Sequence, residues 1–262
     1  EARRIEAALP ATPDDPGWNE VEAFYVPLVG QIIVPERWFA PSVDGVFVQA
    51  VHNGEALALR LVWHDPSRSP DPSWLEWQEA VLAVVHADGE RPAAGPRPDA
   101  FAVQFPTEVP ETPQLPYFLM GDRTRPVYLW RWTSEPDRAQ EAVARGMGRV
   151  EPLAAPSTVE HAAVFDQGEW RLVLRRPLRT EPATGRLQFE TGRAIPIAFF
   201  AWDGDNGEDG TRGAVSAWYY IYLAEPTPPS VYITPVAAVL LTAGFGWLAA
   251  RRAQRGSRGG NA

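Results

Sequence analysis

The chain has 262 residues, a formal net charge of −9 at pH 7 and no cysteine, and its 24 basic residues are all arginine because no lysine occurs. The absence of cysteine excludes disulfides, thiolate metal sites and covalent c-type haem attachment, and the acidic balance argues against a nucleic-acid partner. A hydrophobic content of 45% and 27 prolines favour a packed all-β chain over a helical bundle or a disordered chain.

Residues 1–20 are polar and rich in proline, which predicts an extended lead-in before a domain over residues 21–226. In that domain, short runs of β-branched and aromatic residues alternate with turn signals, as antiparallel strands do. Several runs place apolar residues at every second position, as in Leu-Ala-Leu-Arg-Leu-Val-Trp at 57–63. The runs predict strands over 23–29, 45–51, 56–63, 80–86, 100–105, 127–132, 161–165, 170–175, 194–202 and 216–223. We therefore predict an all-β antiparallel β-sandwich, with one helix over 136–146.

The end of the chain differs in composition from this domain. A proline linker at 227–230 is followed by an uncharged apolar run over 231–250, about the length of a helix that crosses a bilayer. Tyr232 and Trp247 fall near the two ends of the run, where aromatic rings favour the membrane interface. The sequence thus predicts a single-pass C-terminal transmembrane helix, and a buried core helix is the alternative.

The basic tail at 251–262 predicts an orientation for this membrane anchor. The tail contains four arginines, and the positive-inside rule places such a cluster in the cytoplasm. The preceding domain would then lie on the periplasmic side of the cell membrane. A chain that begins at Glu1 rather than Met fits a cleaved signal peptide, and a fragment boundary would look the same.

The sequence lacks the usual catalytic signatures. It has no nucleophile elbow, P-loop, dinucleotide fingerprint or H-E-x-x-H motif, and its four histidines are scattered singly. The acidic run Asp-Gly-Asp-Asn-Gly-Glu-Asp-Gly at 203–210 has enough carboxylates to hold Ca²⁺, but it lacks the EF-hand spacing. A solvated turn is the favoured interpretation of that run. These features predict a chain that is not itself an enzyme.

The chain contains two methionines, and each can be weighed separately. Met147 lies between two glycines, which indicates a loop. Met120 lies just before the strand predicted at 127–132, where it could fill a gap in the core or ligate haem iron through its thioether. Composition alone leaves both roles of Met120 open.

A series of short segments resembles a known family when the segments are taken in order. They lie at 13–18 (PDDPGW), 26–31 (VPLVGQ), 59–65 (LRLVWHD), 99–106 (DAFAVQFP), 120–122 (MGD), 126–132 (PVYLWRW), 168–178 (GEWRLVLRRPL), 200–204 (FAWDG) and 216–220 (SAWYY). This series resembles the ethylbenzene-dehydrogenase-type haem b domain over roughly residues 10–224. The resemblance implies a β-sandwich related to DOMON domains and to family 9 carbohydrate-binding modules (CBM9).

The resemblance also implies a role in electron transfer. Members of this family serve as the γ, or C, subunit of molybdenum enzymes of the dimethyl-sulfoxide-reductase (DMSO reductase) superfamily. In such complexes a molybdopterin subunit is catalytic and an iron–sulfur subunit relays electrons. The haem b subunit passes single electrons between that relay and a cytochrome c or a quinone-linked partner. The resemblance thus implies a non-catalytic subunit of an oxidoreductase complex.

The family typically holds its iron with a methionine and a lysine. The methionine carries over to Met120. The lysine would fall where this chain has Arg212 and Gly213, and the chain has no lysine at all. Arginine cannot replace it, because a guanidinium stays protonated and offers no lone pair. A histidine could take over, with His64 and His161 as candidates; otherwise the iron could keep five ligands or bind water, or haem could be lost.

Other residues would surround a haem in this domain. Candidates for the walls of the pocket are Trp130, Trp132, Trp202 and Phe118, whose alternative role is ordinary core. Candidates for pairing with the haem propionates are Arg123, Arg125 and Arg131. Two other hypotheses stay open. One is a haem-less anchoring or scaffold subunit, which the missing lysine favours, and the other is a carbohydrate-binding sandwich that uses Trp74 and Trp77.

Overall fold

The structure, a computed structural model, describes residues 1–73, 76–77, 80, 97–111, 114–181, 185–225 and 230–258. The chain divides into two units, Glu1–Ala224 and Glu225–Ala262, and each is described by itself. Apart from residue 80, the strand predicted over 80–86 lies outside the described residues, and so does Trp74.

The first unit contains two β-sheets. The first sheet consists of β1 (Arg3–Arg4), β2 (Phe24–Pro27), β4 (Gly45–His52), β5 (Ala56–His64), β10 (Glu160–Asp166) and β11 (Glu169–Pro177). These strands follow the order β1-β4-β5-β11-β10, with β2 paired to β4. Neighbouring strands are antiparallel, except that the short β1 runs parallel to β4.

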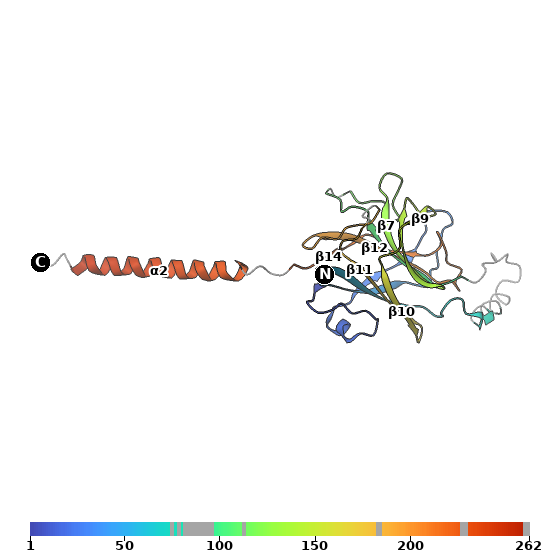
Figure 1. The fold of residues 1–262 in the computed structure, drawn as a ribbon, viewed down its shortest axis with the longest axis horizontal. Helices are drawn as coiled ribbons and strands as arrows, with labels where there is room; N and C mark the ends of the chain where they lie inside the picture. Colours follow the sequence, from blue (N-terminus) through green and yellow to red (C-terminus); the bar gives the residue numbers. More distant parts are fainter. Residues whose placement is uncertain are drawn as a thin grey trace. The chain divides into compact units, whose positions relative to one another are not determined.

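The second sheet consists of β3 (Val29–Gly30), β6 (Ala100–Pro106), β7 (Val127–Ser134), β8 (Asp137–Ala144), β9 (Val150–Pro152), β12 (Ala194–Trp202), β13 (Ala214–Val215) and β14 (Tyr219–Tyr222). Its order is β3-β13-β12-β6-β7-β8-β9, and β14 pairs with β12. In Figure 1, β7 and β9 of this sheet lie on one side of the unit and β10 of the first sheet lies on the other. The two packed sheets confirm the predicted antiparallel sandwich.

Alternate side chains of both sheets point into the space between the sheets. Along β7 the inward residues are Tyr128, Trp130 and Trp132, and those of β5 include Leu59 and Trp63, all of them buried. The ring centroids of Trp63 and Trp132 lie 6.0 Å apart in an edge-to-face contact that joins the two sheets. Burial of a large apolar side chain contributes about 1.5–3 kcal/mol, so this aromatic core is a main source of cohesion between the sheets.

The helix predicted over 136–146 is wrong, because this segment forms strand β8. The strand makes a hairpin with β7, in which Ala139 lies opposite Trp132. Exposed polar residues at its start suggested a solvated helical face, but the second half of the strand, including Glu141, is buried. Pairing with the aromatic strand β7 therefore overrides the local helix propensity of the segment.

The first twenty residues pack more closely on the sandwich than a surface lead-in would. The short 3₁₀ helix η1 (Pro16–Glu20) buries Trp18, whose indole Nε1 donates to the Thr12 carbonyl oxygen at 3.0 Å. Leu9 and Trp18 join an apolar cluster with Ala58 on the outward face of the first sheet. A few apolar residues within a polar segment are thus enough to cover this face.

The second unit contains the helix α2 (Ser230–Arg258). Within the described part of the chain, no helix is both long and apolar enough to cross a membrane. The transmembrane helix predicted over 231–250 is therefore corrected to a helix that continues into the arginines of the tail.

Candidate functional site

The second sheet has two apolar faces, and the predicted haem residues are divided between them. The inward face belongs to the core of the sandwich. The outward face carries a separate buried cluster, called the outer-face cluster, which consists of Ala100, Ala102, Leu119, Met120, Val127, Leu129, Ala142, Ala144, Phe200, Trp202 and Val215. Partly buried residues that pack against it are Val34, Phe118, Met147, Val150 and Trp218. Alternation along β7 explains the division, since Leu129 points outward and Trp130 points inward.

Met120 belongs to the outer-face cluster and has an unusual backbone conformation. The residue is buried, with 4% of its surface exposed. Its φ is +60° and that of Gly121 is +71°, so two consecutive residues occupy the left-handed region. The Met120 carbonyl oxygen accepts a hydrogen bond from the Gly146 N–H at 2.7 Å, which ties this turn to the segment that carries Met147. A non-glycine residue in this conformation costs about 1–2 kcal/mol, and such strain is concentrated at functional sites.

The turn that holds Met120 also depends on Gly121. We expect Gly121→Ala to lower the unfolding free energy by about 2–3 kcal/mol, because the new Cβ would lie 2.6 Å from the Arg125 carbonyl oxygen at a positive φ. Gly148→Ala is the matched control, since Gly148 also has a positive φ but has no atom within 4 Å of an added Cβ. The control should lose only about 1 kcal/mol. Urea unfolding measures both losses, and equal values would contradict the close approach at Gly121.

Two buried polar atoms on the outward face have no hydrogen-bond partner within the described residues. They are Nε of Arg131 and Oε1 of Gln104. Trp202 stacks on Phe200 with 6.0 Å between ring centroids, and the guanidinium carbon of Arg131 lies 5.8 Å from the Trp202 ring. A buried polar atom without a partner costs about 1–3 kcal/mol. The face that carries Met120 therefore has unsatisfied polar groups that a bound molecule could satisfy.

Trp130 and Trp132 lie on the opposite face of the sheet from Met120, inside the sandwich. The indole Nε1 of Trp130 donates to the Tyr128 hydroxyl at 2.9 Å, and that of Trp132 donates to Asp137 Oδ1 at 2.8 Å. The Arg176 guanidinium lies 5.9 Å from the Trp130 ring. The structure therefore gives these two tryptophans the role of ordinary core and does not bring them together with Met120.

Of the other predicted residues, two arginines lie in the turn that follows Met120, and the two histidines lie on the other sheet. Arg123 and Arg125 are exposed in the turn that precedes β7. His64 is exposed at the end of β5, and Nε2 of His161 on β10 lies 3.0 Å from Asp137 Oδ1. Both histidines belong to the first sheet, whereas the outer-face cluster lies on the second.

The segment where the family's lysine would fall runs along the outward face of the second sheet. Gly213 packs so closely on Trp202 that a Cβ would lie 2.6 Å from the Trp202 Cδ1 atom. Arg212 is held elsewhere: its Nε lies 3.6 Å from Glu36 Oε2, and its guanidinium carbon lies 5.8 Å from the Trp38 ring. The arginine at this position thus makes surface contacts of its own.

Comparison with protein families gives a match to the ethylbenzene dehydrogenase family over residues 15–152, which is more than half of the chain. The chain belongs to this family. The matched region contains Met120 and the strands β2 to β9, whereas Trp202 and the segment around Arg212 lie beyond it. The resemblance inferred from the segment series is thereby confirmed.

Three relatives in this family are named as subunits of larger enzymes. The chain is 27% identical to a respiratory nitrate reductase heme subunit of Haloferax mediterranei, over 89% of this chain and 74% of that protein. It is 33% identical to the chlorate reductase subunit gamma of Ideonella dechloratans, over 56% of this chain and only 57% of that protein. It is 26% identical to the dimethylsulfide dehydrogenase subunit gamma of Rhodovulum sulfidophilum, over 86% of this chain and 80% of that protein.

Among solved structures, the chain is similar to a family 9 carbohydrate-binding module from Caldicellulosiruptor kristjanssonii in complex with cellotriose. The TM-score is 0.48 at 11% identity, and the match covers 87% of this chain and 96% of the module.

The sequence pattern did not reveal that a second residue with a candidate ligand atom packs against the outer-face cluster. Met147 packs partly buried against the cluster that contains Met120. One feature of the sequence could have indicated that the two methionines lie close together: they flank the same hairpin, β7–β8. The glycines beside Met147 pointed to a loop and hid its apolar contact.

Proposed function

We propose that this chain is the electron-transfer subunit of an oxidoreductase complex and that it binds haem b on the outward face of the second sheet. The observation that carries the proposal is Met120, a buried thioether that a strained left-handed turn presents on that face. Family membership supports the proposal, and so does the relative named as a heme subunit. The site on this face differs from the pocket that the sequence predicted, because Trp130 and Trp132 take no part in it.

The residues present on the outward face fit a haem group. Met120 offers a thioether ligand for the iron. The alanines of the outer-face cluster, such as Ala100 and Ala102, are small, apolar and buried beside Met120. Trp202 is buried in the same cluster, and the Nε of Arg131, which has no hydrogen-bond partner among the described residues, can donate to a carboxylate. A bound haem would supply one-electron redox chemistry, and a thioether ligand tends to raise its potential.

The second ligand to the iron is part of the proposal. The lysine that is usual in the family is absent. His64 and His161, the second ligands predicted from the sequence, lie on the other sheet. Met147 is the better candidate, because it packs on the same cluster as Met120 and its loop is hydrogen-bonded to Met120 through Gly146. We therefore propose Met120 and Met147 as the two residues that hold the iron.

The proposed partners follow from the family relation. We propose that the subunit docks on an iron–sulfur subunit of a complex whose molybdopterin subunit is catalytic. It would exchange single electrons between that relay and a cytochrome c or a quinone-linked protein. Two relatives support this arrangement, because they are named as gamma subunits of chlorate reductase and dimethylsulfide dehydrogenase. In this arrangement no residue of the chain takes part in substrate chemistry.

Absorption spectroscopy of the full chain tests the proposal. Protein reconstituted with haemin should show a Soret band when oxidised, and sharpened α and β bands after reduction with dithionite. Met120→Leu should remove most of the low-spin α band, because leucine preserves the volume but not the sulfur lone pair. Met147→Leu should have the same effect if Met147 is the second ligand.

Histidine variants provide the controls for this experiment. His64→Ala and His161→Ala should leave the spectrum unchanged, and a loss of the α band in either variant would transfer the second-ligand role to that histidine. A featureless visible spectrum of the full chain, even with its partner subunits present, would contradict the haem proposal. The haem-less scaffold subunit would then be the better function, as the absence of lysine favours.

A further inference from the structure

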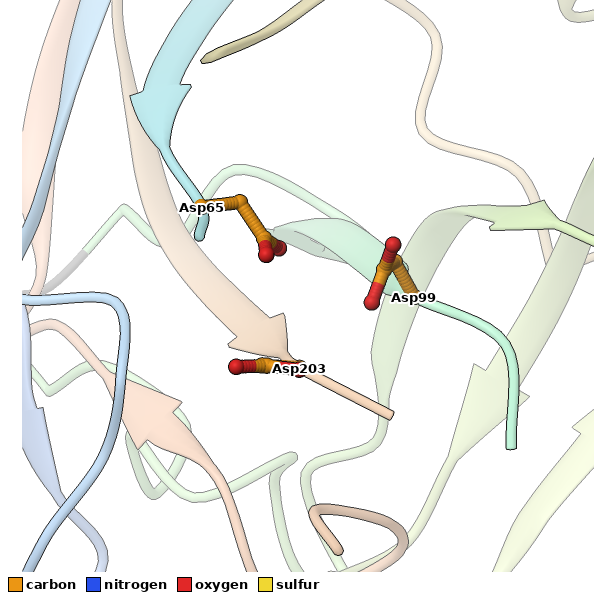
Figure 2. A group of neighbouring side chains, drawn as sticks. All are labelled: Asp65, Asp99 and Asp203. Carbon is orange, nitrogen blue, oxygen red and sulfur yellow. The ribbon is translucent and has the colours of Figure 1, made fainter. Parts of the chain in front are cut away.

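Three aspartates from distant parts of the chain meet at one end of the sandwich. Asp65 follows β5 of the first sheet, Asp99 precedes β6 of the second sheet, and Asp203 follows β12 of the second sheet. One carboxylate oxygen from each lies within 4.8 Å of the others, and Figure 2 shows the Asp65 carboxylate directed toward the other two. All three residues are buried, with exposed fractions of 0%, 0% and 1%. They are called the aspartate triad.

Among the residues that the structure describes, no positive charge pairs with the aspartate triad. Two further carboxylates beside it, those of Asp205 and Glu208, are also buried. Within the described residues, none of these five acids forms an ion pair with an arginine. In the described part of the chain, their hydrogen bonds come only from backbone N–H groups, serines, an asparagine and tryptophans. Buried ionised carboxylates without a counter-charge are costly, so the site requires either protons or a cation.

The hydrogen bonding of Asp65 decides between these alternatives. Its Oδ1 accepts from the Ser67 N–H at 3.2 Å, but its Oδ2 is buried and has no partner within the described residues. A carboxylic acid proton would need an acceptor, and an ionised oxygen would need a donor or a cation. Oδ2 has neither. A cation held among the triad would satisfy this oxygen and neutralise the charge at the same time.

We infer that the aspartate triad is a binding site for a hard divalent cation, with Ca²⁺ as the best match. The ligand atoms are carboxylate oxygens only, with no nitrogen or sulfur, which is the donor set of Ca²⁺ and Mg²⁺ rather than of zinc or copper. Ca²⁺ accepts carboxylates from irregular loops, whereas Mg²⁺ demands near-octahedral geometry and retains most of its water. The buried position of the triad favours the cation that gives up its water more readily.

The loops around the aspartate triad are built to hold these oxygens in place. Asp99 accepts from the Ser69 N–H at 2.8 Å, from Trp170 Nε1 at 3.1 Å and from the Gly204 N–H at 3.1 Å. Gly204 leaves no space for a side chain, because a Cβ would lie 1.9 Å from the Arg97 carbonyl oxygen. Oriented carboxylates of this kind are typical of a site that is arranged before the cation binds.

The inferred cation would connect both sheets of the sandwich. It would join the end of β5 to the start of β6 and the end of β12, and no single hairpin links these three segments. The role is structural: none of the three aspartates belongs to the outer-face cluster proposed to bind haem, although Asp99 directly precedes Ala100 and Asp203 directly follows Trp202 in that cluster. Failure of the cation inference would therefore leave the haem proposal untouched.

The test uses the full chain after treatment with a chelator. Ca²⁺ should raise the melting temperature of the wild-type protein by about 5–10 °C at about a hundredfold excess over its dissociation constant. Calorimetry should show one Ca²⁺ bound per chain. Asp65→Asn removes one anionic ligand with little change in shape, and it should weaken binding by about tenfold or more. Mg²⁺ in a parallel titration should give a smaller rise in melting temperature.

Asp209→Asn is the matched control, since Asp209 lies in the same acidic loop but is exposed and pairs with Arg97 at 3.1 Å. It should bind Ca²⁺ as the wild type does. Elemental analysis of protein purified without chelator should find about one calcium per chain, a result that does not depend on any variant. An unchanged melting temperature of the wild type with millimolar Ca²⁺, Mg²⁺ and Mn²⁺ would overturn the inference, as would equal loss of binding in Asp209→Asn.

Discussion

Replacing Glu141 by alanine is expected to lower the unfolding free energy by about 3–5 kcal/mol, because it removes the carboxylate that pairs with a buried arginine. Oε2 of Glu141 lies 3.0 Å from Arg186 Nη2, and both side chains are almost fully buried. Glu141 also accepts hydrogen bonds from the Tyr128 hydroxyl and, at 2.7 Å, from the Thr158 N–H. Burial alone would raise the pKa of Glu141, but these hydrogen bonds and Arg186 outweigh it and lower the pKa.

The surface of the same sheet offers a matched control. Arg145 Nη1 lies 3.1 Å from Glu151 Oε2, nearly the same distance, but 71% of the Glu151 side chain is exposed. Water already solvates this pair, so Glu151→Ala should cost less than about 1 kcal/mol. Urea unfolding of the full chain measures both variants. Similar losses of unfolding free energy at the two positions would show that burial does not determine how much these ion pairs stabilise the protein.

Removing divalent cations is expected to make the stability of the protein fall as the pH rises from about 4 toward 9. Burial, followed by the neighbouring charges of Asp99 and Asp203, raises the pKa of Asp65 to about 9, and Glu208 contributes in the same direction. Burial also raises the pKa of Asp99 to about 6, against hydrogen bonds from Ser69 and Gly204. Both values exceed the pKa of an aspartate in the unfolded chain, about 3.9.

The sign of this effect follows from proton linkage. The folded protein binds more protons at these sites than the unfolded chain does, so the stabilisation is complete below about pH 4 and is lost as the pH rises through the folded pKa values. Each such group contributes a slope of up to about 1.4 kcal/mol per pH unit. Chemical unfolding at a series of pH values in the presence of a chelator measures the slope.

Two comparisons make this prediction specific. Asp65→Asn cannot lose a proton at this position, so its stability should fall less steeply between pH 4 and 9 than that of the wild type. Added Ca²⁺ should flatten the wild-type curve, because the cation replaces the proton. A wild-type slope that neither change reduces would show that other groups control the pH dependence.

Several strands could be predicted from the sequence because their hydrophobic period is visible locally. The runs at 45–51, 56–63 and 194–202 alternate or are continuously apolar, and the structure has strands at each of them. Strand β8 could not be recognised in this way. Its polar first half resembles a solvated helix, and its buried second half is explained only by the partner strand β7 and by the Arg186 guanidinium.

The sequence could name Met120 as a candidate ligand, but it could not name the residues that surround it. Met120 was singled out from the sequence, and the structure places it in a buried cluster with Trp202. The sequence made Trp130 and Trp132 candidates for the walls of a haem pocket, with ordinary core as the alternative. Strand alternation puts these two on the other face of the sheet, and a one-residue difference in position is enough to exchange faces.

The sequence by itself determined the class of the fold and the family, because alternation, turn residues and ordered motifs are local signals. The tertiary structure alone decided which side chains meet. The acidic run at 203–210 predicts a solvated turn, yet Asp203 is buried beside Asp65 and Asp99, which lie more than a hundred residues away along the chain. Contacts between such distant residues depend on how the two sheets pack, and no local pattern encodes that packing.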